Sequence, residues 1–357
     1  MAELDLDALK QFQFLVFSKL EGAMTSGMIH LGDRLGLFAA LAAADTPLTS
    51  AELAERAGLD ERWVREWAYN QAAARIVVVD TDERFSLTPE AVAVLTRSDS
   101  DACGIGMFHS LPNTMRMLDE LPDAFRSGIG RDYDAHGVEA AAGLERSFEP
   151  WNRVHLLPTV LPTLDGVSEK LAAGANVADI GCGPGGAVLL LAEAFPASTV
   201  AGYDISQHAL TRARTRLAEA GLANASFHDP REEPLPSDHS VDLVTTFDCI
   251  HDMTDPQSMM VAIREAIADD GTWLLVDIKA RDTFAENMLK NPMAPLMYGV
   301  SVFSCMSSAL SEPGGAGLGT LGLPPSKAEA MAGQAGFTRF RKLPVDHAVN
   351  AFYEIRP

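Results

Sequence analysis

The sequence has few cysteines, and they lie far apart. The four are Cys103, Cys182, Cys249 and Cys305, with no C-x-x-C spacing among them. This distribution argues against a disulfide framework and against zinc, so we predict no bound metal. Reduced, buried cysteines are typical of a cytoplasmic protein, which is the location we expect.

Basic residues are scarce as well. Lysine and arginine number 28 against 49 aspartate and glutamate residues, which leaves a formal net charge of −21. A field of that sign opposes phosphate backbones and anionic lipid. The densest positive cluster, Arg339, Arg341 and Lys342, is too small to reverse it. We therefore predict no nucleic acid and no membrane surface as a partner.

The chain also lacks the features of exported or membrane-spanning proteins. Its N-terminus, MAELDLDALK, is acidic where a signal peptide is basic. Residues 291–311 carry no charge, but they include two prolines, an asparagine and five serines. They fall short of the apolarity that a spanning helix needs, so we expect a segment buried within the protein.

A glycine-rich turn between two strands is the most informative stretch. Residues 176–180 predict an apolar strand, 181–186 are almost all glycine, 187–195 predict a helix and 198–204 a second strand. Such a βαβ unit places the turn at the carboxyl edge of a parallel sheet, where nucleotide-like ligands bind.

Asp179 indicates which ligand binds there. Gly181, Gly183 and Gly186 also fit the G-x-G-x-x-G spacing of a dinucleotide fold. A carboxylate two places before the first glycine would repel a pyrophosphate, and it would attract the ammonium of a methionine moiety. The motif D-x-G-x-G-x-G, with Asp204 closing the next strand, resembles the class I S-adenosylmethionine-dependent methyltransferases.

The resemblance implies S-adenosylmethionine as the cofactor. In that family the first acid lies near the methionine part, the glycines let the backbone approach, and the strand-two acid holds the ribose hydroxyls. Asp229 matches the position that reaches the adenine amino group, although an acid capping a turn is the alternative. The implied cofactor residues are Asp179, Gly181, Cys182, Gly183, Asp204, Ile205, Asp229, Pro230, Phe247 and Asp248.

The N-terminal part has the pattern of a winged helix. Its second helix has a nearly neutral face, Trp63 and Trp67 suit packing, and the wing tip around Asp80 is acidic, all of which disfavours DNA binding. A winged-helix transcriptional regulator stays open as an alternative. The predicted elements are two helical stretches in 4–44, a helix capped by Thr49 or Ser50 and ended by Gly58, a helix from Asp60 through Ala74, strands 76–79 and 84–87, and a helix opened by Pro89.

A winged helix before a methyltransferase domain resembles the plant-type small-molecule O-methyltransferases and similar bacterial enzymes. In those enzymes the N-terminal domain dimerises, so a homodimer is implied. We expect an α/β fold, a Rossmann-like seven-stranded methyltransferase sheet preceded by an all-helical, winged-helix domain. The expected domains are a dimerisation domain (1–100), a helical connector and active-site cap (101–170), and a cofactor-binding domain (171–357) with an insertion at 280–323.

The resemblance becomes local at FDCIHDMTDP. His251, Asp252 and Asp255 reproduce a family pattern in which the histidine is the general base. An imidazole that titrates near neutral pH can take the proton of a phenol or alcohol as the methyl group is attacked. A packed, structural histidine is the alternative. The glutamate that orients the base in plant-type enzymes is missing here, and the candidates to replace it are Asp248, Asp252, Asp282 and Glu312.

The insertion is rich in methionine and ends in a glycine run. We interpret it as a wall and lid for an apolar or aromatic acceptor, or equally as a dimer interface. The predicted function is O-methylation of a small, partly apolar molecule. An N- or C-methyltransferase without a general base is the alternative. The weaker candidates for substrate contact are Trp151, His155, Met297 and Phe303.

Overall fold

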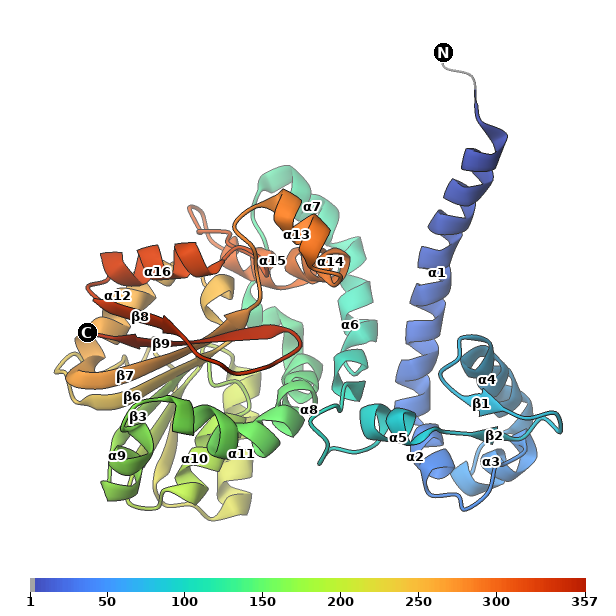
Figure 1. Ribbon diagram of the computed structural model, residues 1–357, viewed down its shortest axis with the longest axis horizontal. Coiled ribbons are helices and arrows are strands. Elements are labelled where there is room, and N and C mark those ends of the chain that lie inside the picture. Colours follow the sequence, from blue (N-terminus) through green and yellow to red (C-terminus); the bar gives the residue numbers. More distant parts are fainter. Residues whose placement is uncertain (1–3) are drawn as a thin grey trace. The chain divides into compact units, whose positions relative to one another are not determined.

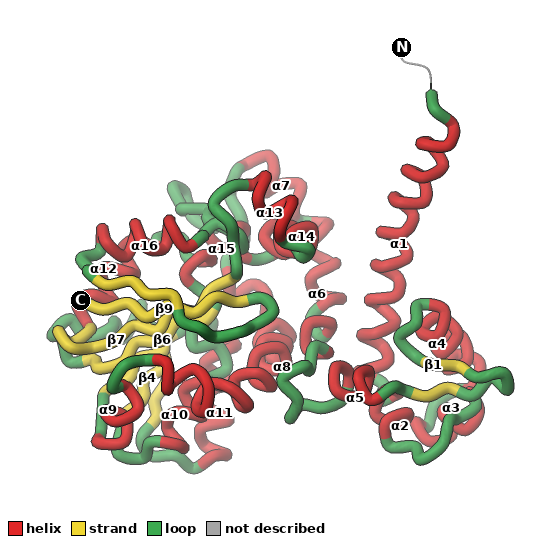
Figure 2. Tube along the Cα trace, in the orientation of Figure 1, coloured by secondary structure: helices red, strands yellow, loops and turns green. Residues whose placement is uncertain are grey.

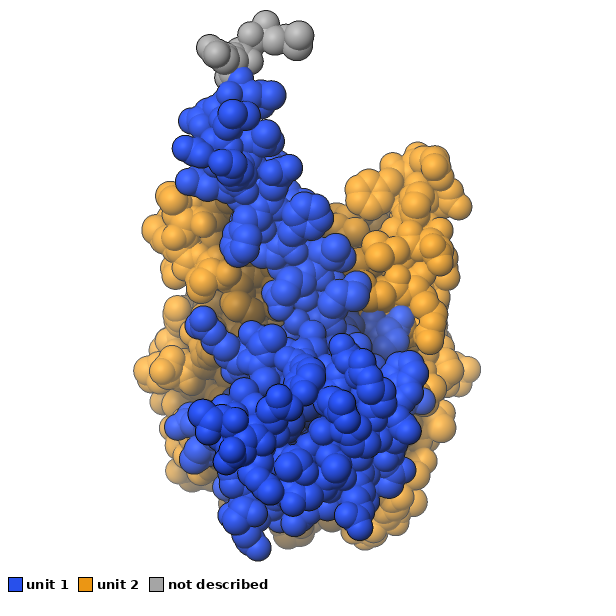
Figure 3. Space-filling view, turned by 90° about the vertical axis from the view of Figure 1, so that its right-hand side faces the viewer, with its two compact units in different colours: residues 1–112, 146–150 blue, residues 113–145, 151–357 orange. Residues whose placement is uncertain are grey.

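The structure, a computed structural model, describes residues 4–357 and divides into two compact units. The first comprises residues up to 112 together with 146–150, and the second comprises 113–145 and 151–357 (Figure 3). Residues 101–170, which the sequence assigns to one connector, are thus shared between the two units.

The first unit is a helical domain with a small two-stranded wing. Thr49 and Glu52 form the reciprocal capping box expected at the start of α3, and Asp60 caps α4. The two strands pair antiparallel but are shorter than predicted. The elements are α1 (Leu6–Arg34), α2 (Leu37–Ala42), α3 (Ser50–Ala57), α4 (Glu61–Ala73), β1 (Val78–Val79), β2 (Phe85–Ser86), α5 (Pro89–Leu95) and the 3₁₀ turn η1 (Ile105–Phe108).

The two tryptophans of helix α4 differ in burial. Trp67 is buried and meets Phe38 edge-on, with ring centroids 5.2 Å apart. Trp63 is 80% exposed, so the expectation that it packs was wrong for this residue. Three and four residues separate buried positions such as Val64, Trp67 and Ala68, and Trp63 lies outside that stripe.

The second unit contains the predicted seven-stranded sheet. The strand order is β5-β4-β3-β6-β7-β9-β8, parallel except for β9, which is antiparallel to both β7 and β8. The last hairpin of the chain therefore closes the sheet, as expected. The strands are β3 (Asn176–Ile180), β4 (Thr199–Tyr203), β5 (Ala225–His228), β6 (Val241–Phe247), β7 (Ile267–Ile278), β8 (Arg339–Lys342) and β9 (Asn350–Arg356).

Helices cover both faces of this sheet (Figures 1 and 2). One core contains Leu171, Val188 and Leu210 from α9, α10 and α11. The other contains Met260 from α12 and Ala328 from α16. These helices are α9 (Val167–Ala173), α10 (Gly186–Ala194), α11 (Gln207–Ala220), α12 (Pro256–Ala266) and α16 (Pro325–Gln334).

The remaining helices come from two segments. Within residues 4–357 no helix is long and apolar enough to cross a membrane, and residues 291–311 form two short helices. The first segment forms α6 (Leu111–Arg116), α7 (Leu121–Ser127), the 3₁₀ turn η3 (Tyr133–His136) and α8 (Gly137–His155). The insertion forms α13 (Phe284–Lys290), α14 (Ala294–Phe303) and α15 (Cys305–Ala309).

Candidate active site

The turn after β3 has a backbone that glycine alone accommodates well. Gly181 and Gly183 both have positive φ, at 68° and 53°. A Cβ at Gly181 would lie 2.6 Å from the Cβ of Cys249, so the turn packs directly against the chain after β6. The amides of Gly181 and Cys182 donate to the carbonyl of Tyr203 at 2.8 and 3.0 Å, which ties the turn to β4.

Asp179 lies buried beneath this turn. It is 1% exposed, and its Oδ1 accepts a 2.6 Å hydrogen bond from the hydroxyl of Thr245, its register partner on β6. Burial raises the pKa of Asp179 to about 7, although the Thr245 bond opposes the shift. The carboxylate therefore points into the protein and not into solvent.

Asp204 ends the neighbouring strand and faces the same turn. Its two oxygens accept 2.8 Å hydrogen bonds from the amides of Gly183 and Ser206. Burial raises its pKa, while those two bonds act in the opposite direction. Asp179 and Asp204 thus place two buried acids at one edge of the sheet.

These two acids fit a positively charged ligand. No lysine or arginine among residues 4–357 forms an ion pair with either of them. A buried carboxylate is costly unless it is paired with a cation as well as hydrogen-bonded, and these two have hydrogen bonds alone. An ammonium or sulfonium compound would supply that missing charge, whereas a pyrophosphate would add repulsion.

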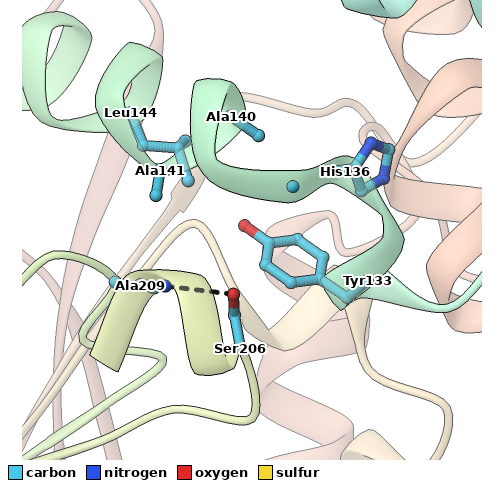
Figure 4. A pocket seen from close by; sticks show the side chains of 9 residues that line it. Tyr133, His136, Ala140, Ala141, Leu144, Ser206 and Ala209 are labelled. Atoms are coloured by element: carbon cyan, nitrogen blue, oxygen red, sulfur yellow. Dashed lines mark hydrogen bonds between the residues drawn. The ribbon is translucent and has the colours of Figure 1, made fainter. Parts of the chain in front are cut away.

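A small cavity adjoins Asp204. In Figure 4 the hydroxyl end of Tyr133 points toward the start of α8, and Ser206 lies on the other side of the ring. Ser206 donates a 2.6 Å hydrogen bond to Asp134, which ties η3 to the turn after β4. The lining residues are Tyr133, His136, Gly137, Ala140, Ala141, Leu144, Gly183, Ser206 and Ala209.

The expected adenine residues lie after β4 and β5. The Asp229 carboxylate accepts hydrogen bonds from Arg231 Nη2 and Gln207 Nε2, both at 2.7 Å. Arg231 also donates to the carbonyl of Ile205 at 2.7 Å, and Pro230 lies between Asp229 and Arg231 in the turn. The structure therefore brings Ile205, Pro230 and Asp229 together, held by an arginine that the sequence interpretation missed.

Phe247 and Asp248 end β6. Phe247 is half-buried against the core under α10, and Cys182 belongs to the same core. Asp248 has a positive φ of 51° and accepts a hydrogen bond from the side-chain amide of Asn350. Burial, followed by the nearby charge of Asp277, raises the pKa of Asp248 to about 7.

His251 lies just beyond, in the 3₁₀ turn η6 (Ile250–Asp252), between two carboxylates. Its Nδ1 is 2.7 Å from Asp277 Oδ1, and its Nε2 is 3.0 Å from Asp252 Oδ1. The imidazole is 1% exposed. Burial alone lowers the pKa of His251, but Asp277 and Asp252 outweigh burial and raise that pKa well above its usual range.

The residue that holds Nδ1 was not among the four predicted candidates. Asp277 comes directly after Val276, which is the register partner of Phe247. The adjacent strands β6 and β7 therefore bring Asp277 and His251 to the same edge of the sheet. Of the four candidates, Asp252 is the one that forms an ion pair with the imidazole. Asp248 accepts from Asn350, Asp282 accepts from Ser326, and Glu312 is exposed. An acid ending the strand that follows the histidine was the available signal.

Two further side chains near this site were also missed. Burial, then the charges of Asp204 and Asp252, raise the pKa of the Tyr133 phenol well above its usual range, which places Tyr133 near both acids. Cys305, expected only as a small buried residue, lies beside His251 and Asp252.

The four weaker substrate candidates fall into separate clusters. Trp151 and His155 stack with centroids 4.8 Å apart, and Trp151 also meets the rings of His347 and Phe352. Met297 is buried against Ala280, Ala294 and Leu321. Phe303 is half-buried at the end of α14. The structure therefore does not bring all four together around His251.

Comparison with protein families agrees with this geometry. Residues 171–312 match the family described as "Methyltransferase domain", and residues 23–97 match the "Rv2258c-like winged HTH domain". The chain is a methyltransferase-domain protein with an N-terminal winged helix. The matched domain includes the glycine turn, both buried acids, His251, Asp277 and Cys305.

Individual relatives and solved structures carry related descriptions. The ubiquinone biosynthesis O-methyltransferase of Paracidovorax citrulli is 29% identical over 130 residues, 36% of this chain and 52% of the relative. The chain thus spans about half the length of that curated relative. Human N-acetylserotonin methyltransferase, solved with S-adenosylmethionine, superposes with a TM-score of 0.70 at 18% identity, covering 100% of this chain and 99% of the other.

A second solved structure contains a small aromatic acid. An O-methyltransferase from neocarzinostatin biosynthesis, in complex with S-adenosylmethionine and 2-hydroxy-5-methyl naphthoic acid, gives a TM-score of 0.64 at 16% identity. The match covers 100% of this chain and 99% of that one. At these identities the likeness shows the fold, which is the expected winged helix followed by a Rossmann-like methyltransferase sheet.

Proposed function

We propose that this protein transfers a methyl group from S-adenosylmethionine to an oxygen of a small, partly apolar acceptor. The observation that carries the proposal is the pair of buried acids at a glycine turn, Asp179 and Asp204, which have no cationic partner within the described residues 4–357. His251, held between two carboxylates, lies at the end of the adjacent strand β6.

In this proposal the acids and the turn bind the cofactor. Asp179 faces the ammonium end, Asp204 faces the ribose, and Gly181 and Gly183 allow close approach of the backbone. Asp229, with Pro230, Ile205 and Phe247, borders the adenine, for which the Asp229–Arg231 pair must rearrange. When bound, the cofactor supplies an electrophilic methyl group on a positively charged sulfur.

His251 then serves as the general base. Asp277 accepts from Nδ1–H, which fixes the ring orientation and leaves Nε2 to take the proton of an acceptor hydroxyl. The acceptor must replace the contact between Nε2 and Asp252. Because the pKa of His251 is raised, the neutral imidazole becomes more abundant, and methyl transfer faster, as pH increases.

A small aromatic hydroxyl compound is the acceptor class we favour. The neighbour solved with a hydroxynaphthoic acid supports this, as do the aromatic and thioether side chains of the 280–323 insertion. Met297 and Phe303 belong to that insertion, and Trp151 and His155 form an aromatic cluster with Phe352 of β9. We propose these four as determinants of acceptor shape.

We also propose a cytoplasmic homodimer in which residues 1–100 mediate dimerisation. The N-terminal half of α1 has a large exposed apolar surface, and in a monomer this surface would remain in contact with water. The exposed side chains are Leu6, Leu9, Phe12, Phe14, Leu15, Val16, Phe17, Leu20 and Met24.

Calorimetric titration with S-adenosylhomocysteine tests the cofactor assignment. We expect this product of methyl transfer to bind the wild type, NAD not to bind, and Asp179→Ala to lose most of the binding. Glu193→Ala, on helix α10 after the same turn, is the matched control and should bind normally. Heat with NAD and none with S-adenosylhomocysteine would overturn the proposal.

A methyltransferase without a general base is the second candidate, because His251 is buried with both ring nitrogens near carboxylates. Replacing His251 by Ala separates the two. A base predicts a loss of kcat of about 10²–10⁴-fold with cofactor affinity retained. Methyl transfer that changes by less than a few-fold would favour the second candidate. The acidic wing and the methyltransferase match do not favour a transcriptional regulator.

A further inference from the structure

Cys305, His251 and Asp252 form a cluster of potential metal ligands that the proposed methyl transfer does not explain. A ring nitrogen of His251, a carboxylate oxygen of Asp252 and the sulfur of Cys305 all lie within 4.8 Å of one another. His251 and Cys305 are buried, and Asp252 is partly buried.

Backbone contacts hold the two segments that form this cluster. The amide of Gly319 donates to the carbonyl of His251 at 3.3 Å, and the amide of Ala316 donates to the carbonyl of Thr254 at 2.8 Å. The end of the insertion is therefore attached to the η6 turn. Helix α15, which contains Cys305, also lies against η6, so the fold brings the backbone of Cys305 close to His251.

The donor set matches zinc. Thiolate, imidazole and carboxylate are the three side-chain ligands that Zn²⁺ prefers, and a site with three of them leaves a fourth position for water. Ligands at about 2.0–2.3 Å in a tetrahedron lie about 3.5 Å from one another. Asp252 Oδ1 and His251 Nε2 are already 3.0 Å apart. The sulfur lies within 4.8 Å of both atoms, and a rotation of the Cys305 side chain can bring it closer.

Asp277 provides the support that zinc-bound histidines usually have. A histidine that binds zinc through one nitrogen commonly donates its other N–H to a carboxylate, which fixes the tautomer and the ring. Here Asp277 Oδ1 is 2.7 Å from Nδ1, so Nε2 is the nitrogen available to a metal. The hydrogen bond that would orient a metal-binding histidine is thus present.

Asp252 adds an unsatisfied oxygen. Its buried Oδ1 has no hydrogen-bond partner among the described residues, since it lies near His251 Nε2 without the alignment of a hydrogen bond. The protonated imidazole of His251 is the cation beside this oxygen, and a metal that displaces the Nε2 proton would supply that positive charge instead.

We propose that His251, Asp252 and Cys305 bind a zinc ion that inhibits the enzyme. Zn²⁺ replaces the thiol proton of Cys305 and the proton on Nε2, and both protons go to solvent. The metal then binds Nε2, so this nitrogen can no longer take the proton of the acceptor hydroxyl. The proposed metal binding does not depend on the proposed function, whereas the proposed inhibition rests on that function. The sequence predicted no metal because spacing rules detect neighbouring ligands, and Cys305 is far from His251 in the chain.

Cobalt(II) is the spectroscopic probe for this site. Titration of the full chain with Co²⁺ should produce a thiolate-to-metal charge-transfer band that saturates at one equivalent and is abolished by added Zn²⁺. Cys305→Ser should remove the band. Cys103→Ser, in the other unit, is the matched control and should keep it. A band that survives in Cys305→Ser, or that never forms in the wild type, would overturn the proposal.

A second variant covers the case in which Cys305→Ser fails to fold. Asp277→Asn keeps all three ligands and alters only the support of the ring, so the band should form with an affinity lower by about 10–100-fold. An unchanged affinity in Asp277→Asn would contradict the assignment of His251 as a ligand.

Inhibition is measured separately from metal binding. One equivalent of Zn²⁺ should stop methyl transfer, a chelator should restore it, and calorimetric binding of S-adenosylhomocysteine should persist with the metal bound. If the band forms but no acceptor is ever methylated, the proposed function fails and the metal site stands. Full activity in the zinc-loaded protein would refute inhibition.

Discussion

At the scale of single residues, the environment of His251 determines how activity should depend on pH. Two carboxylates outweigh burial and raise its pKa, so the base is protonated, and the enzyme less active, below that raised value. Removing one carboxylate should lower the pKa of His251. We therefore expect Asp252→Asn to shift the acid limb of log(kcat/KM) toward lower pH.

The pH profile of kcat/KM, with saturating cofactor, measures this shift. Asp269→Asn is the matched control, because Asp269 is an exposed carboxylate on β7 and should leave the limb in place. An acid limb that stays fixed in Asp252→Asn would show that Asp252 does not control the titration of the base.

Asp179 leads to a prediction about stability. Its pKa is about 7 in the folded protein, above the ordinary value of 3.8, so the folded state binds a proton more tightly than the unfolded state. This contribution to stability is complete at low pH and is lost as pH rises toward and through 7. A shift of about 3 units corresponds to at most ~4 kcal/mol.

Asp179→Asn should therefore stabilise the cofactor-free protein more at pH 8 than at pH 5. The asparagine carbonyl can still accept from Thr245, so the local hydrogen bond is retained. Thermal unfolding at both pH values measures the effect, and S-adenosylhomocysteine should bind the variant poorly. Equal changes in Tm at pH 5 and pH 8 would mean that the charge of Asp179 is not responsible.

At the scale of elements, the turn between β3 and α10 requires glycine for two different reasons, positive φ and lack of space for a Cβ. Both Gly181 and Gly183 have positive φ, but a Cβ would clash with Cys249 only at Gly181 and would meet nothing within 4 Å at Gly183. We expect Gly183→Ala to cost about 1–2 kcal/mol from backbone strain. Gly181→Ala should cost about 2–5 kcal/mol, since overpacking adds to the same strain.

Urea denaturation of the two variants compares these costs directly. Gly183 borders the cavity beside Asp204, so its variant should also lose affinity for S-adenosylhomocysteine although it folds. Gly333→Ala, with negative φ and open space for a Cβ, is the control and should be neutral or slightly stabilising. Equal destabilisation of the two turn variants would exclude the clash as a cause.

Local signals explain which elements the sequence predicted well. The capping box at Thr49, the N-cap at Asp60 and the turn after β3 depend on residues within a few positions, and all three are present. Strand ends depend on pairing partners. β7 begins at Ile267, where its first residue pairs with Val241 across an irregular register.

The site was predictable as far as its motifs extended. The sequence indicated the buried acids and His251, but the contacts of His251 come from residues distant in the chain. The contact with Asp277 can be predicted once β6 and β7 are known to be neighbours. The contact with Cys305 can be predicted only when the fold of the insertion is known. The position of Asp277 at the end of the next strand was the available signal for the first contact, and spacing along the chain contains no information about the second.

At the scale of the whole molecule, residues 101–170 show what a linear division into domains misses. The chain leaves the first unit after Pro112, returns for residues 146–150 and leaves again. Within the first unit, Arg146 forms an ion pair with Asp33 of α1 at 2.6 Å. A helical stretch that the sequence indicates as one connector therefore contributes to two cores.

Helix α1 leads to the last prediction, which concerns assembly. Phe14 is 78% exposed and Phe17, one turn later, is 65% exposed. A helix that is apolar around most of its circumference is stable in water when another surface covers it. In the proposed homodimer that surface belongs to a second copy of the chain, so we expect the wild type to have the mass of a dimer.

Phe14→Glu combined with Phe17→Glu should dissociate this dimer. Each buried phenylalanine contributes about 1.5–3 kcal/mol, so the double variant should raise the dimer Kd by more than about 100-fold. Light scattering during size-exclusion chromatography measures the mass. Gln13→Glu adds one charge to the same helix next to Phe14 and is the control, with a smaller expected effect. A wild-type protein that is monomeric at micromolar concentration would refute dimerisation through α1, and the exposed apolar surface would then need a different partner.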